Sequence, residues 1–462
     1  MADATPPSDI AAPAPFTGTP VEGAHAERLP RRLGAWSAAA VLISTIIGSG
    51  IFRVPRTVAA ETGSVGGMLL CWVAGGIIAL CGVLALSELA TMYPRAGGIY
   101  VYLREAYGRL TAFLFGWTDL IALPAATAAI ALVFAGYART FAPMSDDDVR
   151  IVAAVLIVLI AALNYRSVRL AAVIQNVSTA GKILALLTLA ASIFILGRGD
   201  GALSRPMQLA PRTVSGFGIA LVAVLFSYDG WASFTSMAGE VRDPDRTLPR
   251  VLVGGLLTVI VVYLVVNLAY LHALTLPEIA VSPMVASDAL QRTVGRAGSS
   301  IVAALVLLST FGAVNSLTMS QPRIFFAMAE DDVFFRRLAA VHPRYRTPHL
   351  AILFATALSL FYVGFHTFEQ LAERFVLATW PFYTLAVAAV FVLRRRRPDA
   401  RRPYRTAGYP LAPTVFVLTA LWIVGNALVK HPGSTLLIFA VVLLGWPLHR
   451  AWEAKRARER AR

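Results

Sequence analysis

The residues best suited to bind a ligand form the stretch Thr45-Ile46-Ile47-Gly48-Ser49-Gly50-Ile51-Phe52. This stretch closes a run without charged residues, from position 33 to position 52, and about 20 such residues can span a membrane as a helix. An interior glycine costs a helix about 1 kcal/mol relative to alanine, and unwound backbone persists in a membrane only where it is buried or lines a cavity. We therefore interpret residues 48–50 as a break that turns backbone N–H groups toward a ligand. Close helix packing through small residues is the alternative.

A broken helix presents two kinds of free backbone group. The second half, which begins near Gly50, offers unpaired N–H groups and the positive end of a helix dipole, a combination suited to a carboxylate. Carbonyl groups at the end of a first half suit an ammonium group. Together they match a zwitterion, and an amino acid has that charge pattern.

Two ionisable residues inside predicted membrane segments are further candidates. Asp229 could pair with a substrate amine or could take and release a proton, because an acid inside a membrane is expensive to bury without a role. A structural pair with Lys or Arg is the alternative. Lys182 could pair with a carboxylate or could donate to the free carbonyls of the first break, where its ammonium would replace a sodium ion. Snorkelling of the long side chain toward the membrane surface is the alternative.

Aromatic and amide residues give weaker signals. Phe226, Tyr228 and Trp231 could shape or gate a pocket. Of the three, only Phe226, which directly precedes a second polar interruption described below, is favoured over plain packing. Asn315 could line a path or form an interhelical hydrogen bond. The sequence has no metal-ligand spacing, phosphate-binding loop or nucleophile–base arrangement. It therefore predicts no cofactor and no enzyme activity.

Composition identifies the elements that position these residues. The 462-residue chain is 57% hydrophobic and only 15% charged, with a mean hydropathy of +0.67, which predicts an all-α integral membrane protein. We expect twelve transmembrane helices at 34–58, 66–90, 110–138, 150–165, 170–196, 214–239, 249–272, 298–325, 348–366, 370–393, 409–430 and 434–449.

Positive charge predicts the orientation. Lys and Arg concentrate in alternate gaps, including Arg242, Arg246 and Arg250 and seven arginines within 394–405. This bias, with an even number of spans, predicts a multi-pass cell-membrane protein with both termini in the cytoplasm. The basic residues form no single face, which argues against nucleic acid as a partner. We expect residues 1–33 to form a disordered cytoplasmic tail and 450–462 a basic cytoplasmic tail.

The sixth segment has an interruption like that of the first. It reads Phe226-Ser227-Tyr228-Asp229-Gly230-Trp231 at mid-depth. Interrupted segments at matching positions of two halves are typical of transporters with inverted repeats. We therefore expect a first five-helix repeat over 34–196, an inverted second repeat over 214–393, discontinuous helices 1 and 6, and two additional helices over 407–449.

Several stretches resemble the amino acid–polyamine–organocation (APC) transporter superfamily, and most closely the bacterial relatives of the L-type amino acid transporters. The matching stretches are Ile46-Ile47-Gly48-Ser49-Gly50-Ile51-Phe52, Tyr93-Pro94-Arg95-Ala96-Gly97-Gly98, Tyr228-Asp229-Gly230-Trp231 and the run from Arg323 to Pro348. The resemblance implies a leucine-transporter-type fold and alternating access around a midplane site. It implies that Gly48, Ser49 and Gly50 hold the substrate carboxylate, that carbonyls at Ile46, Phe226 and Asp229 hold the amine, and that Lys182 lies near the first break. Taking the neighbours at both breaks and the candidates above together, the expected substrate-binding residues are Ile46, Ile47, Gly48, Ser49, Gly50, Phe226, Ser227, Tyr228, Asp229 and Gly230. The expected coupling or gating residues are Lys182, Asp229, Trp231 and Asn315.

Two departures from this family affect the expectation. Several L-type members have a small residue where this chain has Asp229, so their large neutral substrates need not apply here. Eukaryotic members that pair with a glycoprotein use a cysteine in the loop between segments 3 and 4. Here the two cysteines, Cys71 and Cys81, lie together in segment 2. We therefore expect no disulfide-linked glycoprotein partner, and the sequence leaves the oligomeric state open.

The leading functional hypothesis is a sodium-independent amino acid transporter that works as an exchanger or a proton symporter. A polyamine or cationic amino acid transporter is one alternative, and such a site should hold a second buried acid, for which Asp119 is the candidate. A membrane sensor that binds an amino acid without moving it is the other alternative.

Overall fold

A computed structural model of the chain describes residues 29–204, 213–295, 297–365, 368–430 and 432–460. Regular structure in these ranges is helical, with one parallel β-bridge between Leu33 and Val241. In chain order the helices are α1 (Ala35–Ile46), α2 (Gly50–Thr62), α3 (Val65–Met92), α4 (Ile99–Tyr107), α5 (Arg109–Ala138), α6 (Asp146–Arg166), α7 (Val168–Leu196), η1 (Ala202–Ser204), α8 (Val214–Ser227), α9 (Trp231–Phe234), η2 (Thr235–Glu240), α10 (Pro244–Ala273), α11 (Leu276–Val281), α12 (Val285–Val294), α13 (Ala297–Glu330), η3 (Arg336–Ala339), α14 (His349–Phe365), α15 (Phe368–Arg396), α16 (Leu411–Lys430), α17 (Pro432–Leu443) and α18 (Gly445–Arg460).

Each predicted hydrophobic segment coincides with a helix or with a broken helix. Among the described residues, eight helices are long and apolar enough to cross a membrane, and the bent pair α1–α2 makes a ninth. The apolar stretches of α14 and α16 are shorter. The all-helical, multi-pass architecture is therefore confirmed, whereas the expected number of twelve transmembrane helices remains a prediction.

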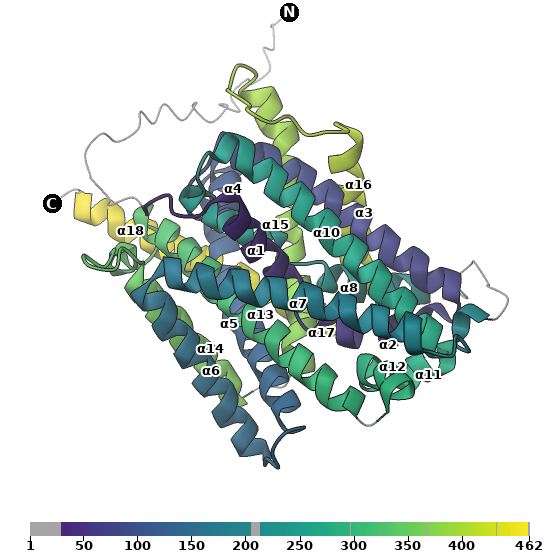
Figure 1. The fold of residues 1–462 in the computed structure, drawn as a ribbon. Coiled ribbons are helices and arrows are strands. Elements are labelled where there is room, and N and C mark those ends of the chain that lie inside the picture. The colour runs from purple at the N-terminus through teal and green to yellow at the C-terminus, as the bar shows by residue number, and fades with distance from the viewer. Residues whose placement is uncertain (1–28, 205–212, 296, 366–367, 431, 461–462) are drawn as a thin grey trace, which may run out of the picture.

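Helices from the two halves of the chain pack against one another in matching pairs. In the described part of the structure α3 packs on α10, α5 on α13 and α6 on α14, while the broken helices meet through α2 and α8. Figure 1 shows α3 lying along α10, and α6 beside α14 at one edge of the bundle. This arrangement brings the two interrupted segments together at the centre of the bundle.

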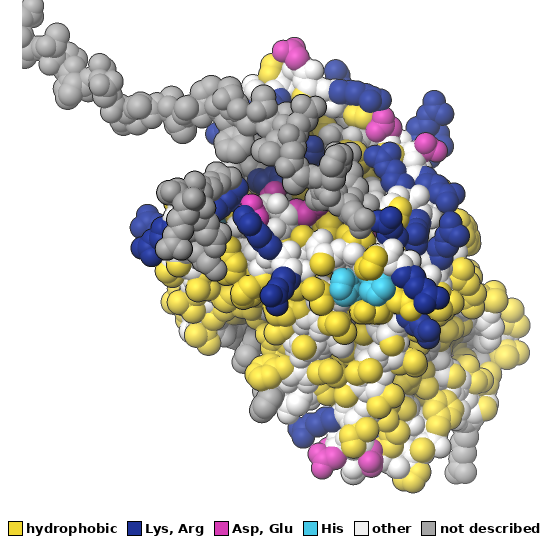
Figure 2. Space-filling model, turned by 90° about the vertical axis from the view of Figure 1, so that its left-hand side faces the viewer, with side chains coloured by type: hydrophobic (Ala, Val, Ile, Leu, Met, Phe, Trp, Pro, Cys, Tyr) yellow, Lys and Arg dark blue, Asp and Glu magenta, His cyan; other side chains and the backbone are white. Residues whose placement is uncertain are grey.

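The outer surface has the charge distribution of a membrane protein. Figure 2 shows a broad apolar surface between an end rich in Lys and Arg and an opposite end with a smaller group of charged side chains. Large apolar side chains are exposed along single helix faces, such as Val155 and Leu159 on α6 and Val177 and Leu184 on α7. Such faces suit lipid, because apolar surface of this extent is otherwise unfavourable in water.

The segment before α1 differs from the expected disordered tail. Residues 1–28 lie outside the described residues, but Leu33 is buried and pairs with the chain beyond η2. Its N–H donates to Glu240 O at 2.9 Å, and the Arg242 N–H donates to Leu33 O at 2.9 Å. The expectation of disorder therefore fails at Leu33, where two backbone hydrogen bonds and a buried side chain order the chain.

The C-terminal helix is longer than the sequence predicted. The last segment was expected to end at 449, but α18 continues to Arg460, so most of the expected basic tail is helical. His449 packs on Phe113 of α5, and Trp452 stacks on Phe334 with ring centroids 6.0 Å apart. These apolar contacts extend the helix past the hydrophobic run, and a pattern of hydropathy alone does not reveal them.

Candidate functional site

A cavity of about 60 Å³ lies where the two interrupted helices meet. On one side α1 ends at Ile46 and α2 begins at Gly50, with a bend of 41° between them. On the other side α8 ends at Ser227 and α9 begins at Trp231. The cavity is lined by Thr45, Ile46, Gly48, Ser49, Gly50, Ala126, Ala129, Ile130, Phe226, Ser227, Asp229, Gly230, Ser233 and Leu317.

Two glycines allow the breaks to touch. A β-carbon on Gly50 would lie 2.6 Å from Ser227 Oγ and 3.0 Å from Ser227 Cα, so any side chain would separate α2 from α8. Gly230 has a φ of 120°, and a β-carbon there would lie 2.7 Å from the carbonyl carbon and oxygen of Thr45. Gly48 differs, because only Ala313 lies within 4 Å of its added β-carbon. All three glycines line the cavity, but close packing explains only Gly50 and Gly230.

The first break presents backbone donors at the cavity. Among the hydrogen bonds of the described residues, none uses the N–H groups of Ser49, Gly50 or Ile51, whereas Phe52 N–H donates to Ser49 O at 3.2 Å. These N–H groups begin the 13-residue helix α2, whose dipole adds positive potential at the same place. The cavity wall therefore offers an anion-binding helix terminus suited to a carboxylate.

The ammonium group of Lys182, a residue of α7, lies at the C-terminal end of α1. Its side chain is fully buried, and its ammonium donates to Ser44 Oγ at 2.7 Å, Ile47 O at 2.8 Å and Ser309 O at 2.9 Å. Three acceptors thus match the three N–H bonds of the ammonium. The negative end of the α1 dipole provides further compensation for the buried charge. Lys182 therefore stays inside the bundle and holds the first break, whereas snorkelling would have carried it to the surface.

Ser309 of α13 adds a second contact to the same break. Its hydroxyl lies 3.3 Å from Ile47 O and 3.1 Å from Gly48 O. A carbonyl freed from a helix in an apolar interior must find a donor, because an unsatisfied buried group costs about 1–3 kcal/mol. Lys182 and Ser309 together satisfy the carbonyls at the end of α1.

Tyr263 of α10 connects the two breaks. Its hydroxyl lies 3.1 Å from Ile46 O and 3.0 Å from Ser227 O, the last carbonyls of α1 and α8. One hydroxyl has one hydrogen to donate, so it satisfies one of these carbonyls at a time and leaves the other able to accept from a ligand. Phe226 O accepts from the Asp229 N–H at 3.3 Å, and Ile46 O accepts from the Gly48 N–H at 2.9 Å, but each carbonyl oxygen has a second lone pair. The carbonyl acceptors available to an ammonium group are therefore those of Ile46, Phe226 and Ser227, beside the Asp229 carboxyl group.

Asp229 lies in the second break and lines the cavity. Within the described ranges it forms no ion pair with Lys or Arg, so the structural pair considered as the alternative is not present there. Its side chain is half-buried. A carboxylate in this position needs either a proton or a cation from a ligand to compensate its burial.

The cavity thus has N–H donors on one wall and carbonyl acceptors with a carboxyl group on the other. Comparison with known proteins identifies the family of the chain. The family model described as amino acid permease matches residues 33–446. The chain belongs to the amino acid permease family. Its members and relatives are transporters and not enzymes.

Curated relatives align with this permease over most of their length. It is 31% identical to the serine/threonine exchanger SteT of Bacillus subtilis (strain 168), an alignment that covers 93% of this chain and 98% of the exchanger. It is 31% identical to the human b(0,+)-type amino acid transporter 1, covering 87% of this chain and 84% of that protein. It is 30% identical to the human cystine/glutamate transporter, covering 94% and 88% respectively.

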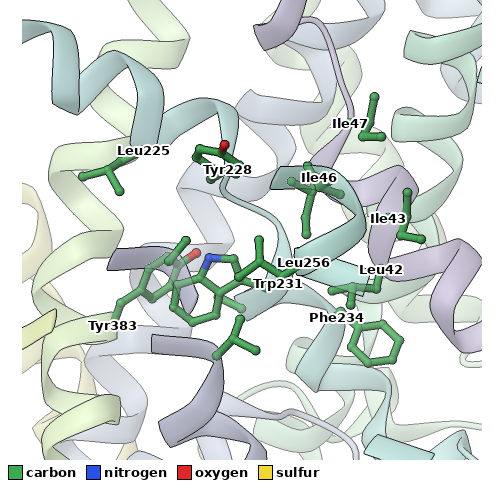
Figure 3. Close-up of a cluster of buried hydrophobic side chains, with 14 of the residues drawn as sticks. Leu42, Ile43, Ile46, Ile47, Leu225, Tyr228, Trp231, Phe234, Leu256 and Tyr383 are labelled. Carbon is green, nitrogen blue, oxygen red and sulfur yellow. The ribbon is translucent and has the colours of Figure 1, made fainter. Parts of the chain in front are cut away.

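Most of the sequence-predicted site residues of this permease meet at the cavity, but some do not. Tyr228 points away from it and packs edge-on against Trp72, with ring centroids 5.9 Å apart. Trp231 packs against Tyr383 and Phe416. Figure 3 shows Trp231 beside Tyr383, with Tyr228 in a separate position near the end of α8. Tyr228 and Trp231 therefore pack against neighbouring aromatic side chains beside the second break and do not line the cavity.

Asn315 and Ile47 also lie outside the cavity lining. The Asn315 amide donates to Gln175 Oε1 at 2.7 Å and to Ala171 O at 3.1 Å, and its oxygen accepts from Asn164 at 2.9 Å. This corresponds to the interhelical hydrogen bond considered as the alternative at this position, and it joins α13 to α7 and α6. Ile47 contributes its carbonyl to Lys182.

Tyr263 and Ser309 were not identified from the sequence. Each is a hydroxyl in the middle of an apolar helix, and a buried hydroxyl usually requires a partner. A hydroxyl in an apolar helix therefore indicates a candidate but does not identify its hydrogen-bond partner. That partner is Ile46 O, 217 residues away, for Tyr263, and Ile47 O, 262 residues away, for Ser309.

We predict that Tyr263→Phe slows transport by this permease about fivefold, because one hydrogen bond to the break contributes about 1 kcal/mol. The ring would keep its contacts with Trp72 and Tyr228, so the unfolding temperature should change little. Initial exchange rates in proteoliposomes measure the effect. Tyr270→Phe in the same helix is the matched control, since the buried Tyr270 hydroxyl has no hydrogen-bond partner among the described residues. Equal rates for the two variants would remove Tyr263 from the site.

Proposed function

We propose that this permease carries amino acids across the cell membrane by alternating access, without sodium, as an exchanger or a proton symporter. The observation that carries the proposal is the Lys182 ammonium at the end of α1, bonded to Ile47 O, Ser44 Oγ and Ser309 O. It supplies a fixed positive charge to the break in place of a sodium ion. The neighbouring donors and acceptors then receive the carboxylate and ammonium groups of the substrate.

Matching helix pairs support the inverted-repeat architecture of the proposal. The pairs α3 with α10, α5 with α13 and α6 with α14 join counterparts of two five-helix repeats, and the two breaks face each other. We propose twelve transmembrane helices with discontinuous helices 1 and 6, a leucine-transporter-type fold, with α16 to α18 outside the repeats. The concentration of Lys and Arg at one end of the bundle supports cytoplasmic termini.

Alternating access requires closure on one side of the cavity at a time. Toward the end rich in Lys and Arg, Arg323 of α13 pairs with Glu240 of η2 at 2.7 Å, and both side chains are almost fully buried. In the same region Ser236 Oγ donates to Ser320 O at 2.9 Å. Breaking the buried ion pair without replacing it is costly. These contacts support a gate that joins η2 to α13 on the cytoplasmic side.

The cavity favours small substrates. Ala126, Ala129 and Gly48 face it with little side-chain volume, and one relative is named a serine/threonine exchanger. We therefore propose small neutral amino acids as the first substrates to test. A cationic amino acid or a polyamine is the second candidate, because a second buried carboxyl group, Asp119, interacts electrostatically with Asp229. A glycoprotein bonded through a disulfide is not part of the proposal, since both cysteines, Cys71 and Cys81, lie in α3.

Uptake of a labelled amino acid panel into proteoliposomes tests the proposal. The vesicles are prepared with and without internal amino acid, and with and without a proton gradient, in sodium-free buffer. Uptake that requires internal substrate establishes an exchanger, whereas uptake into empty vesicles driven by external acid establishes a symporter. Binding without uptake would favour a sensor. Uptake of polyamines alone would replace the proposed substrate class, and dependence on sodium would contradict the role given to Lys182.

A further inference from the structure

A second acidic residue lies beyond the central cavity. Asp119 of α5 is only 3% exposed, and its Oδ1 atom has no hydrogen-bond partner among the described residues. It lines a small closed space together with Phe115, Tyr383, Ser233 and other residues, namely Gly97, Ile99, Ala232, Ser236 and Ile324. A buried carboxyl oxygen without a partner is costly, so packing does not explain the presence of an acid there.

This space lies between the central cavity and the end rich in Lys and Arg. Along α5, which begins at Arg109, Asp119 is about 15 Å from the start of the helix at a rise of 1.5 Å per residue. Ala126, which lines the central cavity, is about 10 Å farther along. Asp119 is therefore placed on the proposed cytoplasmic side of the substrate.

Ser233 connects the two spaces. It lines both the central cavity with Asp229 and the closed space with Asp119. Tyr383 lines the closed space together with Ser233 and Asp119, and the charges of both Asp229 and Asp119 act on Tyr383. Ser233 thus lies between the acid that lines the substrate cavity and a second acid that does not line it.

Among the residues that the structure describes, no positive side chain pairs with Asp119 or Asp229. The charged group that acts on Asp119 is Asp229. The charged groups that act on Tyr383 are Asp119 and Asp229. Two neighbouring carboxylates without a cation repel each other strongly in an apolar interior. One proton on the pair removes that repulsion. An ammonium group from a substrate would provide the same positive charge.

We propose that Asp119 and Asp229 form a proton-binding pair that holds one more proton in the empty carrier than in the loaded carrier. This inference rests on the proposed amino acid transport and narrows its coupling to exchange, in which a proton can replace the internal amino acid. When a substrate ammonium reaches Asp229, the O–H bond on the pair breaks and its proton leaves to water. The pair goes from a charge of −1 with one proton to −2 beside one ammonium group. The local charge is unchanged, and the proton takes the place of the substrate during the return step.

Proton release on binding tests the inference directly. Binding of L-serine to the purified full-length permease is followed by calorimetry at pH 7 in two buffers of different ionisation enthalpy, which counts the protons released. About one proton per bound L-serine is expected for the wild-type protein. The apparent Kd should rise about tenfold for each unit that the pH falls across the competing range, by linkage between proton and substrate.

Asp119→Asn keeps the shape of the side chain and removes its charge. Asp229 can then stay ionised in the empty carrier, so binding should persist with proton release near zero and a flat pH profile. Asp147→Asn, which removes an exposed carboxylate at the start of α6, is the control and should behave like the wild type. If Asp119→Asn does not fold, the number of protons that the wild-type protein releases per bound L-serine tests the inference by itself.

Three outcomes would overturn the inference. If L-serine binds between pH 5 and 8 without releasing a proton, the proton-binding role of the pair is excluded, while the proposed amino acid transport still stands. Weak binding of L-arginine or putrescine by Asp119→Asn, with L-serine unaffected and no proton release in the wild type, would make Asp119 a subsite for a second substrate cation. Failure to bind any amino acid would remove the proposed function together with this inference.

A transport measurement gives the direction. In empty vesicles, acid inside should support net L-serine uptake several-fold above vesicles at equal pH, because the returning carrier takes its proton from the inside. Acid outside should slow uptake. The opposite dependence would indicate proton symport and would contradict the exchange of proton for substrate.

Discussion

Replacing Lys182 by alanine is expected to lower transport turnover by about 10- to 100-fold while leaving the protein folded. The change removes the donor to Ile47 O, Ser44 Oγ and Ser309 O. Each carbonyl left without a donor costs about 1–3 kcal/mol, and about 1.4 kcal/mol corresponds to a tenfold change in rate. The cost is concentrated on the end of α1, whose geometry places Ile46 O in the cavity. Initial rates of exchange measure the loss, and thermal unfolding measures the stability.

Two variants separate the role of the ammonium from general damage to α7. Leu184→Ala removes an exposed side chain two residues away and should leave the rates unchanged. Gly312→Ala perturbs the same site from α13, because its β-carbon would lie 3.2 Å from Lys182 Nζ and 2.8 Å from Ser44 Oγ. We expect it to slow transport in the same way. Wild-type rates for Lys182→Ala would show that the break keeps its shape without the ammonium.

The place of the cavity between the two breaks could be predicted because its signal is local. Two glycine-containing interruptions lie in otherwise apolar segments, and each is visible within about ten residues. The energetic penalty of unwound backbone in a membrane makes such interruptions informative. For the same reason Asp229 and Lys182 could be identified as candidates, since charged residues are rare at that depth.

The partners of these residues could not be predicted, because they depend on contacts between distant segments. The sequence left Lys182 with several possible roles, and only the position of α7 beside the end of α1 distinguishes them. Tyr263 and Ser309 became recognisable only through the carbonyl groups that they meet. The different roles of the glycines also depend on a neighbour, since Gly50 is packed against Ser227 while Gly48 is not packed.

The fold shows the same division between local and distant information. Long apolar helices follow from hydropathy, and the predicted segments agree within five residues with α3, α5, α6, α7, α10, α13, α14, α15 and α16. The short helices α4, α11 and α12 were not predicted, because they are too short and too polar to produce a membrane signal. The pairing of Leu33 with Glu240 and Arg242 joins residues about 200 positions apart, and no local pattern encodes it.

Replacing Ser49 by leucine is expected to abolish substrate binding. Ser49 is 3% exposed, lines the cavity and precedes the first turn of α2. A leucine side chain would extend into a space of about 60 Å³, and overpacking a closed site of this kind costs about 1–3 kcal/mol before any ligand is present. It would also cover the N–H groups that we assign to the substrate carboxylate. Binding of the labelled substrate identified in the uptake panel is the measurement.

Ser49→Ala distinguishes the loss of space from the loss of the hydroxyl group. The backbone N–H groups and the cavity volume both remain in this variant, and none of the hydrogen bonds of the described residues uses the Ser49 hydroxyl. We therefore expect Ser49→Ala to bind within about threefold of the wild type, since removing an unpaired hydroxyl costs little. Loss of binding in Ser49→Ala would assign the hydroxyl itself to the substrate. Retained binding in Ser49→Leu would move the substrate away from the first break, because a leucine and a substrate carboxylate cannot occupy the same space.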